Sequence, residues 1–189
     1  MHMPSPHNVA PTQGLYQPDE FKDNCGFGLI AHMQGDASHD LVKTAIHSLS
    51  CMTHRGGIAA DGKTGDGCGL LLAMPKAFFR EEAARLSDIT LSEVFAVGTV
   101  FLNLDPALAA HAKSILSKEL EEEGCRVIAW RVVPTNNDAL GSIAMQSLPA
   151  FEQVIVNCPL GVTEVEFNRK LFLARRRAEQ QLTSDPYFY

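Results

Sequence analysis

The pattern of apolar and polar residues predicts alternating strands and helices along residues 27–182. Short apolar runs between turn residues are typical of strands, and apolar residues that recur at steps of three and four are typical of amphipathic helices. The predicted strands are residues 27–33, 70–74, 94–102, 125–133 and 151–156, and the predicted helices are residues 38–52, 75–86, 105–124 and 163–182. Because these elements alternate without a clear repeat, we expect an α and β layered domain.

Three of the predicted helices begin with residues that suit a helix N-terminus. Ser38 and Asp105 can each accept a hydrogen bond from the first free backbone amides, and Pro106 suits the first helical position. Thr163 and Glu166 form a capping-box pair ahead of the last helix. These local signals fix where the helices should start.

Two of the predicted strands can be described in more detail. Residues 70–74 are a continuous apolar run, which is typical of a strand buried on both faces. In residues 125–133 the alternation places Val127, Ala129 and Arg131 on one face and Ile128, Trp130 and Val132 on the other. We expect the face with the arginine to be the wetter one. Residues 139–146 are ambiguous, and residues 187–189 suggest the start of another strand.

Residues 1–24 differ in composition from the rest of the chain. Pro4, Pro11, Pro18 and Gly14 stand among polar residues, with no apolar period that could bury against a core. The segment also lacks the apolar core of a secretory signal and the arginines of a transit peptide. We therefore predict a leader over residues 1–24 and a domain over residues 25–189.

The overall composition is that of an ordinary globular protein, with 46% hydrophobic and 20% charged residues. The formal net charge of -6 gives no bulk attraction to nucleic acid or to an anionic membrane. No window approaches the roughly 20 apolar residues of a membrane span. The 5 cysteines form no C-x-x-C pair, so we expect no metal site. Cytoplasm is the expected location.

Residues 54–69 form a glycine-rich loop with glycines at positions 56, 57, 62, 65, 67 and 69. Within it, residues 57–64 fit the phosphate-binding pattern G-x-x-x-x-G-K-S/T letter for letter. That loop needs a strand before it and a helix directly after it. Here a predicted helix precedes the loop and further glycines follow it, so nucleotide binding is the weaker alternative.

Cys25 stands where the leader meets the first predicted strand. On composition alone, a buried structural cysteine is the commoner outcome beside an apolar strand. Gly26 and Gly28, however, leave its surroundings open to a substrate. If the bond between Asn24 and Cys25 were cut, the thiol could act as a nucleophile. The freed α-amine, with an ordinary pKa of about 7.7 to 8.0, could then take the thiol proton.

A second candidate is Arg55, which stands in the sequence HRGG at residues 54–57. An arginine on a glycine loop can hold a carboxylate through two parallel hydrogen bonds, or it can tie down the carbonyls of its own loop. The sequence leaves both roles open for Arg55. His54 could serve Cys25 as a base, but the spacing does not show that the two meet.

Three segments together carry a resemblance to a known family: residues 23–32 (DNCGFGLIAH), residues 52–57 (MTHRGG) and residues 60–69 (ADGKTGDGCG). In this order they resemble the start of the large subunit of bacterial glutamate synthases, over about residues 20–189. The resemblance implies a class II glutamine amidotransferase domain with the α+β fold of the N-terminal-nucleophile (Ntn) hydrolases. In that four-layer αββα fold, two antiparallel sheets are sandwiched between helical layers.

The resemblance also implies roles for individual residues. Residues 1–24 would be a propeptide, and Cys25, once it is the first residue, would attack the side-chain amide of L-glutamine. The freed amine would act as its base, Arg55 would support the pocket, and the released ammonia would pass to 2-oxoglutarate. Residues 61–69 are a family signature without an assigned chemical step. FMN, an iron–sulfur cluster and a reductase small subunit or ferredoxin are implied for the full-length enzyme, outside this segment.

By the same resemblance, the chain is the N-terminal portion of its domain. In the family, the oxyanion hole and the groups that hold glutamine lie beyond residue 189, so we expect the fold to be incomplete at its C-terminal end. Oxyanion donors contribute a factor of about 100 to 1000, so the 189-residue chain alone should have little or no glutaminase activity. The alternatives are a non-catalytic interaction fragment that keeps its leader and a P-loop nucleotide-binding protein.

Overall fold

A computed structural model describes residues 26–52, 57–65 and 67–189. The chain divides into two compact units, one made of residues 1–58 with 65–70 and the other of residues 59–64 with 71–189. In the described part of the chain, the first unit contains one helix, and the second contains the sheet and the other helices.

The first unit contains helix α1 (His39–Cys51). Ser38 caps this helix, as the sequence predicts, because its hydroxyl accepts a hydrogen bond from the Leu41 amide at 3.2 Å. None of the residues of α1 is fully buried. The apolar side of the helix is therefore only partly covered within the described part of the first unit.

Two predicted strands do not form in the described residues. Residues 27–33 and 70–74 are irregular, and their side chains include Phe27, Leu29 and Leu71, which are 90%, 89% and 100% exposed. An apolar run becomes a strand only when a neighbouring strand takes up its backbone hydrogen bonds. No described strand pairs with either segment, so both strand predictions are wrong for this structure.

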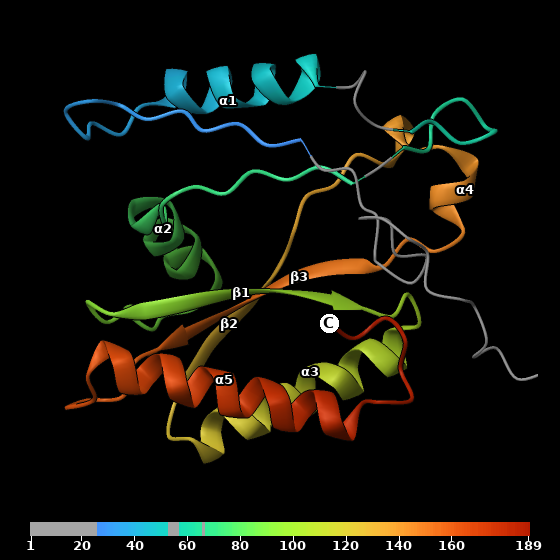
Figure 1. The fold of residues 1–189 in the computed structure, drawn as a ribbon. Coiled ribbons are helices and arrows are strands. Elements are labelled where there is room, and N and C mark those ends of the chain that lie inside the picture. The colour runs from blue at the N-terminus through green and yellow to red at the C-terminus, as the bar shows by residue number, and fades with distance from the viewer. Residues whose placement is uncertain (1–25, 53–56, 66) are drawn as a thin grey trace, which may run out of the picture. The chain divides into compact units, whose positions relative to one another are not determined.

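The second unit alternates helices and strands, which confirms the α+β class (Figure 1). Its elements in chain order are α2 (Lys76–Leu86), β1 (Phe95–Leu102), α3 (Pro106–Glu122), β2 (Arg126–Val132), the 3-10 helix η2 (Asn137–Ala139), α4 (Ser142–Met145), β3 (Ala150–Asn157) and α5 (Glu164–Gln181). Of the ambiguous residues 139–146, Ala139 is the last residue of η2 and residues 142–145 form the single turn of α4.

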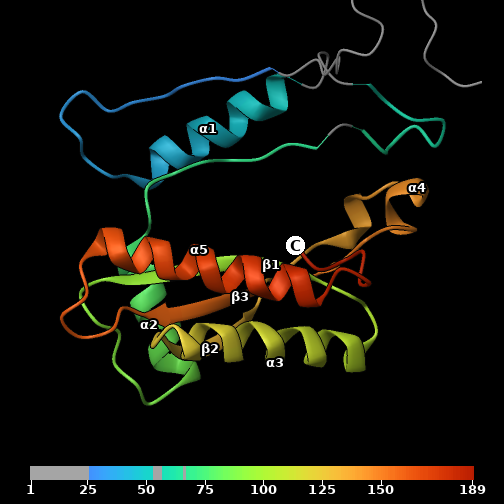
Figure 2. The same ribbon diagram turned by 60° about the horizontal axis from the view of Figure 1, so that its bottom comes forward.

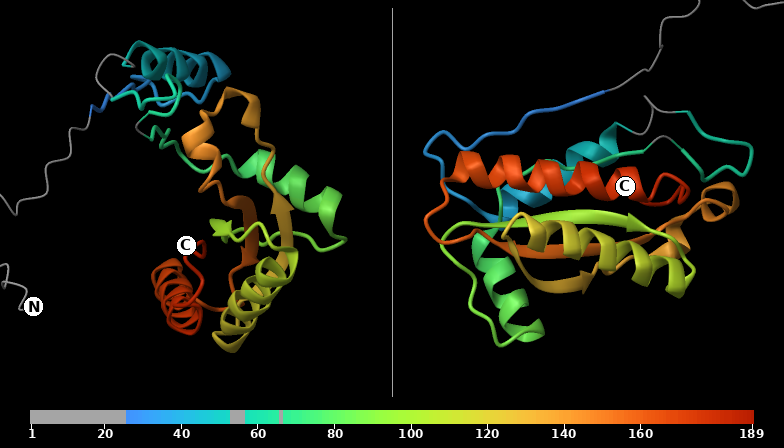
Figure 3. Two further views of the ribbon diagram at one scale, coloured as in Figure 1. Left: turned by 90° about the vertical axis from the view of Figure 1, so that its right-hand side faces the viewer. Right: turned by 90° about the horizontal axis from the view of Figure 1, so that it is seen from below.

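The three strands form one antiparallel sheet in the order β1-β3-β2. β3 is the central strand although it comes last in the sequence, and its Asn157 is opposite Phe95 on one side and Arg126 on the other. Helices α3 and α5 lie side by side on one face of the sheet (Figures 1 and 2). Helix α2 packs on the other face (Figure 3).

Each face of the sheet has its own apolar core. Toward α3 and α5 the buried residues are Val100, Leu102, Ala112, Leu116, Leu120, Cys125, Val154, Val156, Phe167, Ala174, Ala178 and Leu182. Toward α2 they are Phe79, Ala83, Leu91, Phe95, Ile128 and Ile155. Successive residues of a strand point to opposite faces, so residues 154–156 of the central strand are all buried.

Strand β2 departs from the predicted alternation. Its register with β3 shifts between Val127 and Ala129, so Ile128 is the extra residue of a bulge. Trp130 therefore packs with Val127 in the core toward α3 and α5, whereas Ile128 packs toward α2. The predicted faces are wrong, and Arg131 is not on a wet face, because its side chain is 15% exposed and pairs with a glutamate of α2.

Two further sequence expectations concern the C-terminal part of the second unit. The capping box of Thr163 and Glu166 is present at the start of α5, as predicted. Residues 187–189 form no strand, but Tyr189 exchanges two backbone hydrogen bonds with Phe101 of β1, at 2.8 and 3.4 Å.

Candidate functional site

The two site residues predicted from the sequence, Cys25 and Arg55, lie outside the described residues. The structure therefore neither places them nor brings them together. The segment that follows Cys25 is exposed, with Phe27 at 90%. A Cβ atom built at Gly28 would meet no atom within 4 Å, so this glycine has open space around it.

The glycine-rich loop contains a short hairpin. Ile58 and Gly65 form an antiparallel bridge, and the Ala59 amide donates to the Thr64 carbonyl at 2.7 Å. The turn is closed at Gly62, whose amide donates to the Ala59 carbonyl at 3.0 Å and whose φ is 70°. A residue with a side chain would be strained at this φ, which explains the glycine.

Asp61 is the most heavily bonded side chain of this hairpin. Its Oδ1 accepts hydrogen bonds from the amides of Lys63 and Thr64, at 3.1 and 2.8 Å. Its Oδ2 accepts from the Thr64 hydroxyl at 2.6 Å and from the Ile143 amide of α4 at 3.0 Å. These donors, the Ile143 amide first, hold the pKa of the Asp61 carboxyl well below its usual range, because hydrogen bonds to a carboxylate favour the charged form.

The hairpin supplies the N-terminal cap of α4. Gly141 stands at the cap position and has no side chain to offer. Asp61 and Thr64 take over this role, because the Ile143 amide donates to Asp61 and the Ala144 amide donates to the Thr64 hydroxyl at 3.1 Å. A Cβ atom at Gly141 would collide with Asp61 Oδ2 and Thr64 Oγ1, so only glycine allows this approach.

The sequence alone did not predict the contact between the hairpin and α4, although each of the two segments has a local pattern that is typical of such a contact. An aspartate three residues before a threonine is suited to bond the following amides, and Gly141 precedes a helix turn without a capping side chain. Neither pattern indicates which other segment of the chain it will bind. Only the folded chain shows that the free amides of one segment meet the free oxygens of the other.

The geometry of residues 57–64 does not favour the nucleotide-binding alternative. A phosphate-binding loop leads directly into a helix whose N-terminal amides hold the phosphates. Among the described residues that follow Thr64, the next helix is α2, which begins at Lys76. The Thr64 hydroxyl is already bonded to Asp61 and Ala144. The letters of the motif are present, but its structural setting is not.

A buried charged cluster lies between α2 and the sheet. Glu82 is 8% exposed, and its carboxylate pairs with Arg131 at 2.6 Å and with Arg85 at 2.7 Å. Arg131 also donates to Gln153 at 3.0 Å and lies over the Phe78 ring, 5.3 Å from its centre. The Arg131 hydrogen bond is the main reason why the pKa of Glu82 is lowered. Because the charges pair with one another, the cluster holds α2 on the sheet and offers no free catalytic group.

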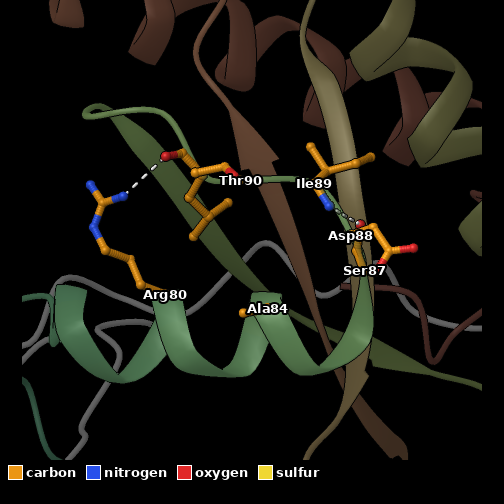
Figure 4. Close-up of a pocket in the computed structure, with 7 residues that line it drawn as sticks. Arg80, Ala84, Ser87, Asp88, Ile89 and Thr90 are labelled. Atoms are coloured by element: carbon orange, nitrogen blue, oxygen red, sulfur yellow. Dashed lines mark hydrogen bonds between the residues drawn. The ribbon is translucent and has the colours of Figure 1, made fainter.

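A pocket of about 280 Å³ lies where α2 leads toward β1 (Figure 4). Arg80 reaches across it and donates to the backbone carbonyls of Leu91 and Ser92, both at 3.0 Å. Ser87, also at the pocket, accepts a hydrogen bond from the Ile89 amide at 3.1 Å. The polar groups of this pocket fasten the connection between α2 and β1, and we assign it no chemical role.

Across residues 26–52, 57–65 and 67–189, no group of three or more histidine, cysteine or acidic side chains is placed to hold a metal ion. The described cysteines, Cys51, Cys68, Cys125 and Cys158, are all free thiols. Iron–sulfur clusters are held by sets of cysteine thiolates, so the described part of the chain does not fit such a cluster. Within the same residues, no helix is both long and apolar enough to span a bilayer.

Comparison with known proteins gives a consistent family match. Residues 25–189 match the family described as glutamine amidotransferases class-II. The chain is 38% identical over 175 residues to the glutamate synthase (NADPH) large chain of Bacillus subtilis. This alignment covers 92% of this chain and 11% of the relative. It is 36% identical over 172 residues to ferredoxin-dependent glutamate synthase 2 of Synechocystis, which covers 89% of this chain and 11% of the relative. The chain thus spans about a tenth of the length of these curated relatives.

Proposed function

The chain belongs to the class-II glutamine amidotransferases, and from that premise we propose that it is the glutaminase portion of a glutamate synthase. In this proposal it hydrolyses L-glutamine to glutamate and ammonia, and the ammonia passes to 2-oxoglutarate elsewhere in the synthase. The observation that carries the proposal is the family match, which begins at residue 25, the position of Cys25.

We assign the chemistry to Cys25 after removal of residues 1–24. The freed α-amine takes the proton of the thiol, and the sulfur attacks the side-chain carbonyl carbon of glutamine. The C–N bond of the tetrahedral intermediate breaks, and ammonia leaves with a proton returned by the amine. Water then attacks the resulting thioester, which releases glutamate and restores the thiol. Arg55 is assigned a supporting role beside the pocket, because an arginine on a glycine loop can hold a carboxylate through two parallel bonds or tie down the carbonyls of its own loop.

The hairpin that follows Arg55 in the sequence is itself held by hydrogen bonds among the described residues. The hairpin begins at Ile58, three residues after Arg55. Its turn is held by the four hydrogen bonds that Asp61 accepts.

We propose the four-layer Ntn sandwich for the part of the domain to which residues 27–33 and 70–74 belong. Both segments are irregular, apolar and exposed in the described structure, so they offer apolar surface that further parts of such a sandwich would cover. The sheet β1-β3-β2 is assigned to a separate α+β subdomain, because helices pack on both of its faces. Hydrogen exchange that is slow at residues 27–33 in the complete protein would support the assignment, and fast exchange there would contradict it.

The cofactors and partners of the proposal lie outside this chain. Relatives are named for NADPH, for ferredoxin and for NADH, and we propose that a reductase small subunit or ferredoxin supplies electrons to the complete synthase. FMN and an iron–sulfur cluster are assigned to other parts of the synthase, because this chain spans only about a tenth of the length of its relatives. We propose the cytoplasm as the location.

The test is an ammonia-release assay with glutamine, run on the complete reading frame that contains this chain. We expect Cys25→Ala to lower glutaminase turnover by at least about 1000-fold, because no other group replaces the nucleophile. The matched control is Cys51→Ala, at an exposed cysteine of α1, which should keep full turnover. The intact mass should show a mature chain that starts at Cys25. Full turnover in Cys25→Ala, or in a protein that still starts at Met1, would overturn the proposal.

A further inference from the structure

Cys125 and Cys158 stand opposite one another at the end of the β2–β3 ladder. Arg126 of β2 is paired with Asn157 of β3 in antiparallel register. Cys125 precedes Arg126 in the sequence, and Cys158 follows Asn157. In an antiparallel pair, the residue before one partner faces the residue after the other. The two cysteines therefore occupy the next opposing position beyond the last pair of the ladder.

The backbone at this position suits a cross-link between the strands. The Cys158 amide donates to the Val94 carbonyl, on the β1 side of β3, at 3.2 Å. The Cys125 amide donates to the Leu120 carbonyl of α3 at 2.9 Å. Neither amide bonds across the gap between β2 and β3, so this is a non-hydrogen-bonded position. Opposing residues at such positions have Cα atoms about 4.5 Å apart, and a disulfide needs about 4.4 to 6.8 Å.

The two side chains lie on the same face of the sheet. Cys125 is 2% exposed and belongs to the core toward α3 and α5, and the half-buried Cys158 packs against the same core. Burial is the first cause that raises the pKa of each thiol. For Cys125 the charge of Cys158 is a further cause, which is consistent with neighbouring sulfur atoms.

We propose that Cys125 and Cys158 form an oxidisable dithiol site, which a peroxide closes to a disulfide between β2 and β3. Cys158 reacts first because it is the more exposed of the two. Its sulfur attacks one oxygen of the peroxide, the O–O bond breaks, and the leaving hydroxide takes the proton of the Cys158 thiol to form water. The product is a sulfenic acid on Cys158.

The second step joins the two sulfur atoms. The Cys125 sulfur attacks the sulfenic sulfur, the S–O bond breaks, and water leaves with the proton of the Cys125 thiol. In total, two thiols and one hydrogen peroxide give one disulfide and two waters. The Cys158 thiol gives up its hydrogen bonds to the Pro159 and Val162 carbonyls, both at 3.6 Å. These are weak bonds, because a thiol is a weak donor.

The test uses the 189-residue chain with Cys25, Cys51 and Cys68 replaced by serine, so that only the two proposed partners remain. The chain is treated with hydrogen peroxide under native conditions, then alkylated and weighed intact. We expect a loss of two hydrogen masses and no alkylation. Trypsin should then release residues 119–126 joined to residues 132–169, and a reductant should separate the two peptides.

Single variants provide the matched controls. With Cys125→Ala or Cys158→Ala in the same background, peroxide should add oxygen or leave the thiol to alkylation, and no joined peptide should appear. The main experiment keeps both cysteines, so a folding defect of a single variant does not decide the result. The proposal is overturned if both thiols of the parent variant gain oxygen without a cross-link. It is also overturned if the cross-link forms only after the chain is unfolded in denaturant.

Discussion

The backbone amide of Ile143 donates a hydrogen bond to the carboxylate of Asp61, 82 residues earlier in the chain, at 3.0 Å. This bond joins the glycine-rich hairpin to α4. Together with the bond from the Ala144 amide to Thr64, it gives α4 its N-terminal cap.

Asp61→Asn should lower the melting temperature of the chain. An asparagine keeps one acceptor oxygen but turns an NH2 group toward amides that also donate, so at least one of these donors loses its partner. Differential scanning calorimetry at neutral pH measures the change. The matched control is Asp138→Asn, at an exposed aspartate of η2, which should melt like the parent. Equal melting temperatures for all three proteins would show that the contact contributes nothing.

The effect of Asp61→Asn should depend on pH. Because the folded-state pKa of Asp61 is lowered, its carboxylate stabilises the fold at every pH above the unfolded-state value of about 3.9. The contribution declines as the pH falls below that value and through the folded-state pKa. The difference in melting temperature between parent and variant should therefore be constant from about pH 5 upward and shrink below about pH 4. A difference that grows on acidification would contradict this sign.

Gly141→Ala should weaken the same contact by a steric route. The backbone at Gly141 has φ −77° and ψ 158°, which alanine adopts without strain. The added Cβ atom, however, would collide with Asp61 Oδ2 and Thr64 Oγ1. We expect a lower melting temperature and faster hydrogen exchange at the Ile143 amide. Gly69→Ala is the control, because a Cβ atom there meets nothing within 4 Å. A loss in Gly69→Ala as large as in Gly141→Ala would argue against the collision.

Thr163→Ala should destabilise α5 by about 1 kcal/mol, the usual cost of removing an N-cap side chain. For a chain of this size, that corresponds to a fall in melting temperature of about 2 to 4 °C. Thr163→Ser, which keeps the hydroxyl, should recover most of the loss. If the Thr163→Ser and Thr163→Ala variants have the same melting temperature, the stability does not come from the hydrogen bond that the Glu166 amide donates to the Thr163 hydroxyl at 3.3 Å.

The described cysteines should react with a thiol reagent in the order of their exposure. Cys51 and Cys68 are exposed, whereas Cys125 is buried and burial raises the pKa of its thiol. Since the thiolate is the reactive form, iodoacetamide under native conditions should label Cys51 and Cys68 well before Cys125. Peptide mapping over time gives the order. Early labelling of Cys125 would mean that the core toward α3 and α5 opens readily.

The features that the sequence predicts correctly are those with local causes. The caps at Ser38, Asp105 and Thr163 depend on amides within three residues of the capping side chain, so a short stretch of sequence contains both partners. The predicted strands 94–102, 125–133 and 151–156 also form, because each has a partner in the described chain.

The features that the sequence does not predict depend on distant partners. The bulge at Ile128 comes from the fit of β2 to β3, and it turns Arg131 toward Glu82 of α2. A prediction that assumes regular alternation of side chains between the two faces does not include an extra residue. The cap of α4 likewise depends on a hairpin far along the chain. Cys25 and Arg55 stay predictions, since both lie outside the described residues.

The position of β3 in the centre of the sheet has a consequence for the order of folding during synthesis. β1 bonds only to β3 within the sheet, and β3 comes after β2. When the ribosome has made residues 95–132, neither finished strand has its neighbour, and both expose unpaired backbone groups. The sheet closes only after residues 150–157 insert between them. Until then the nascent chain depends on the local helices α2 and α3, and this interval is when a chaperone would be most useful.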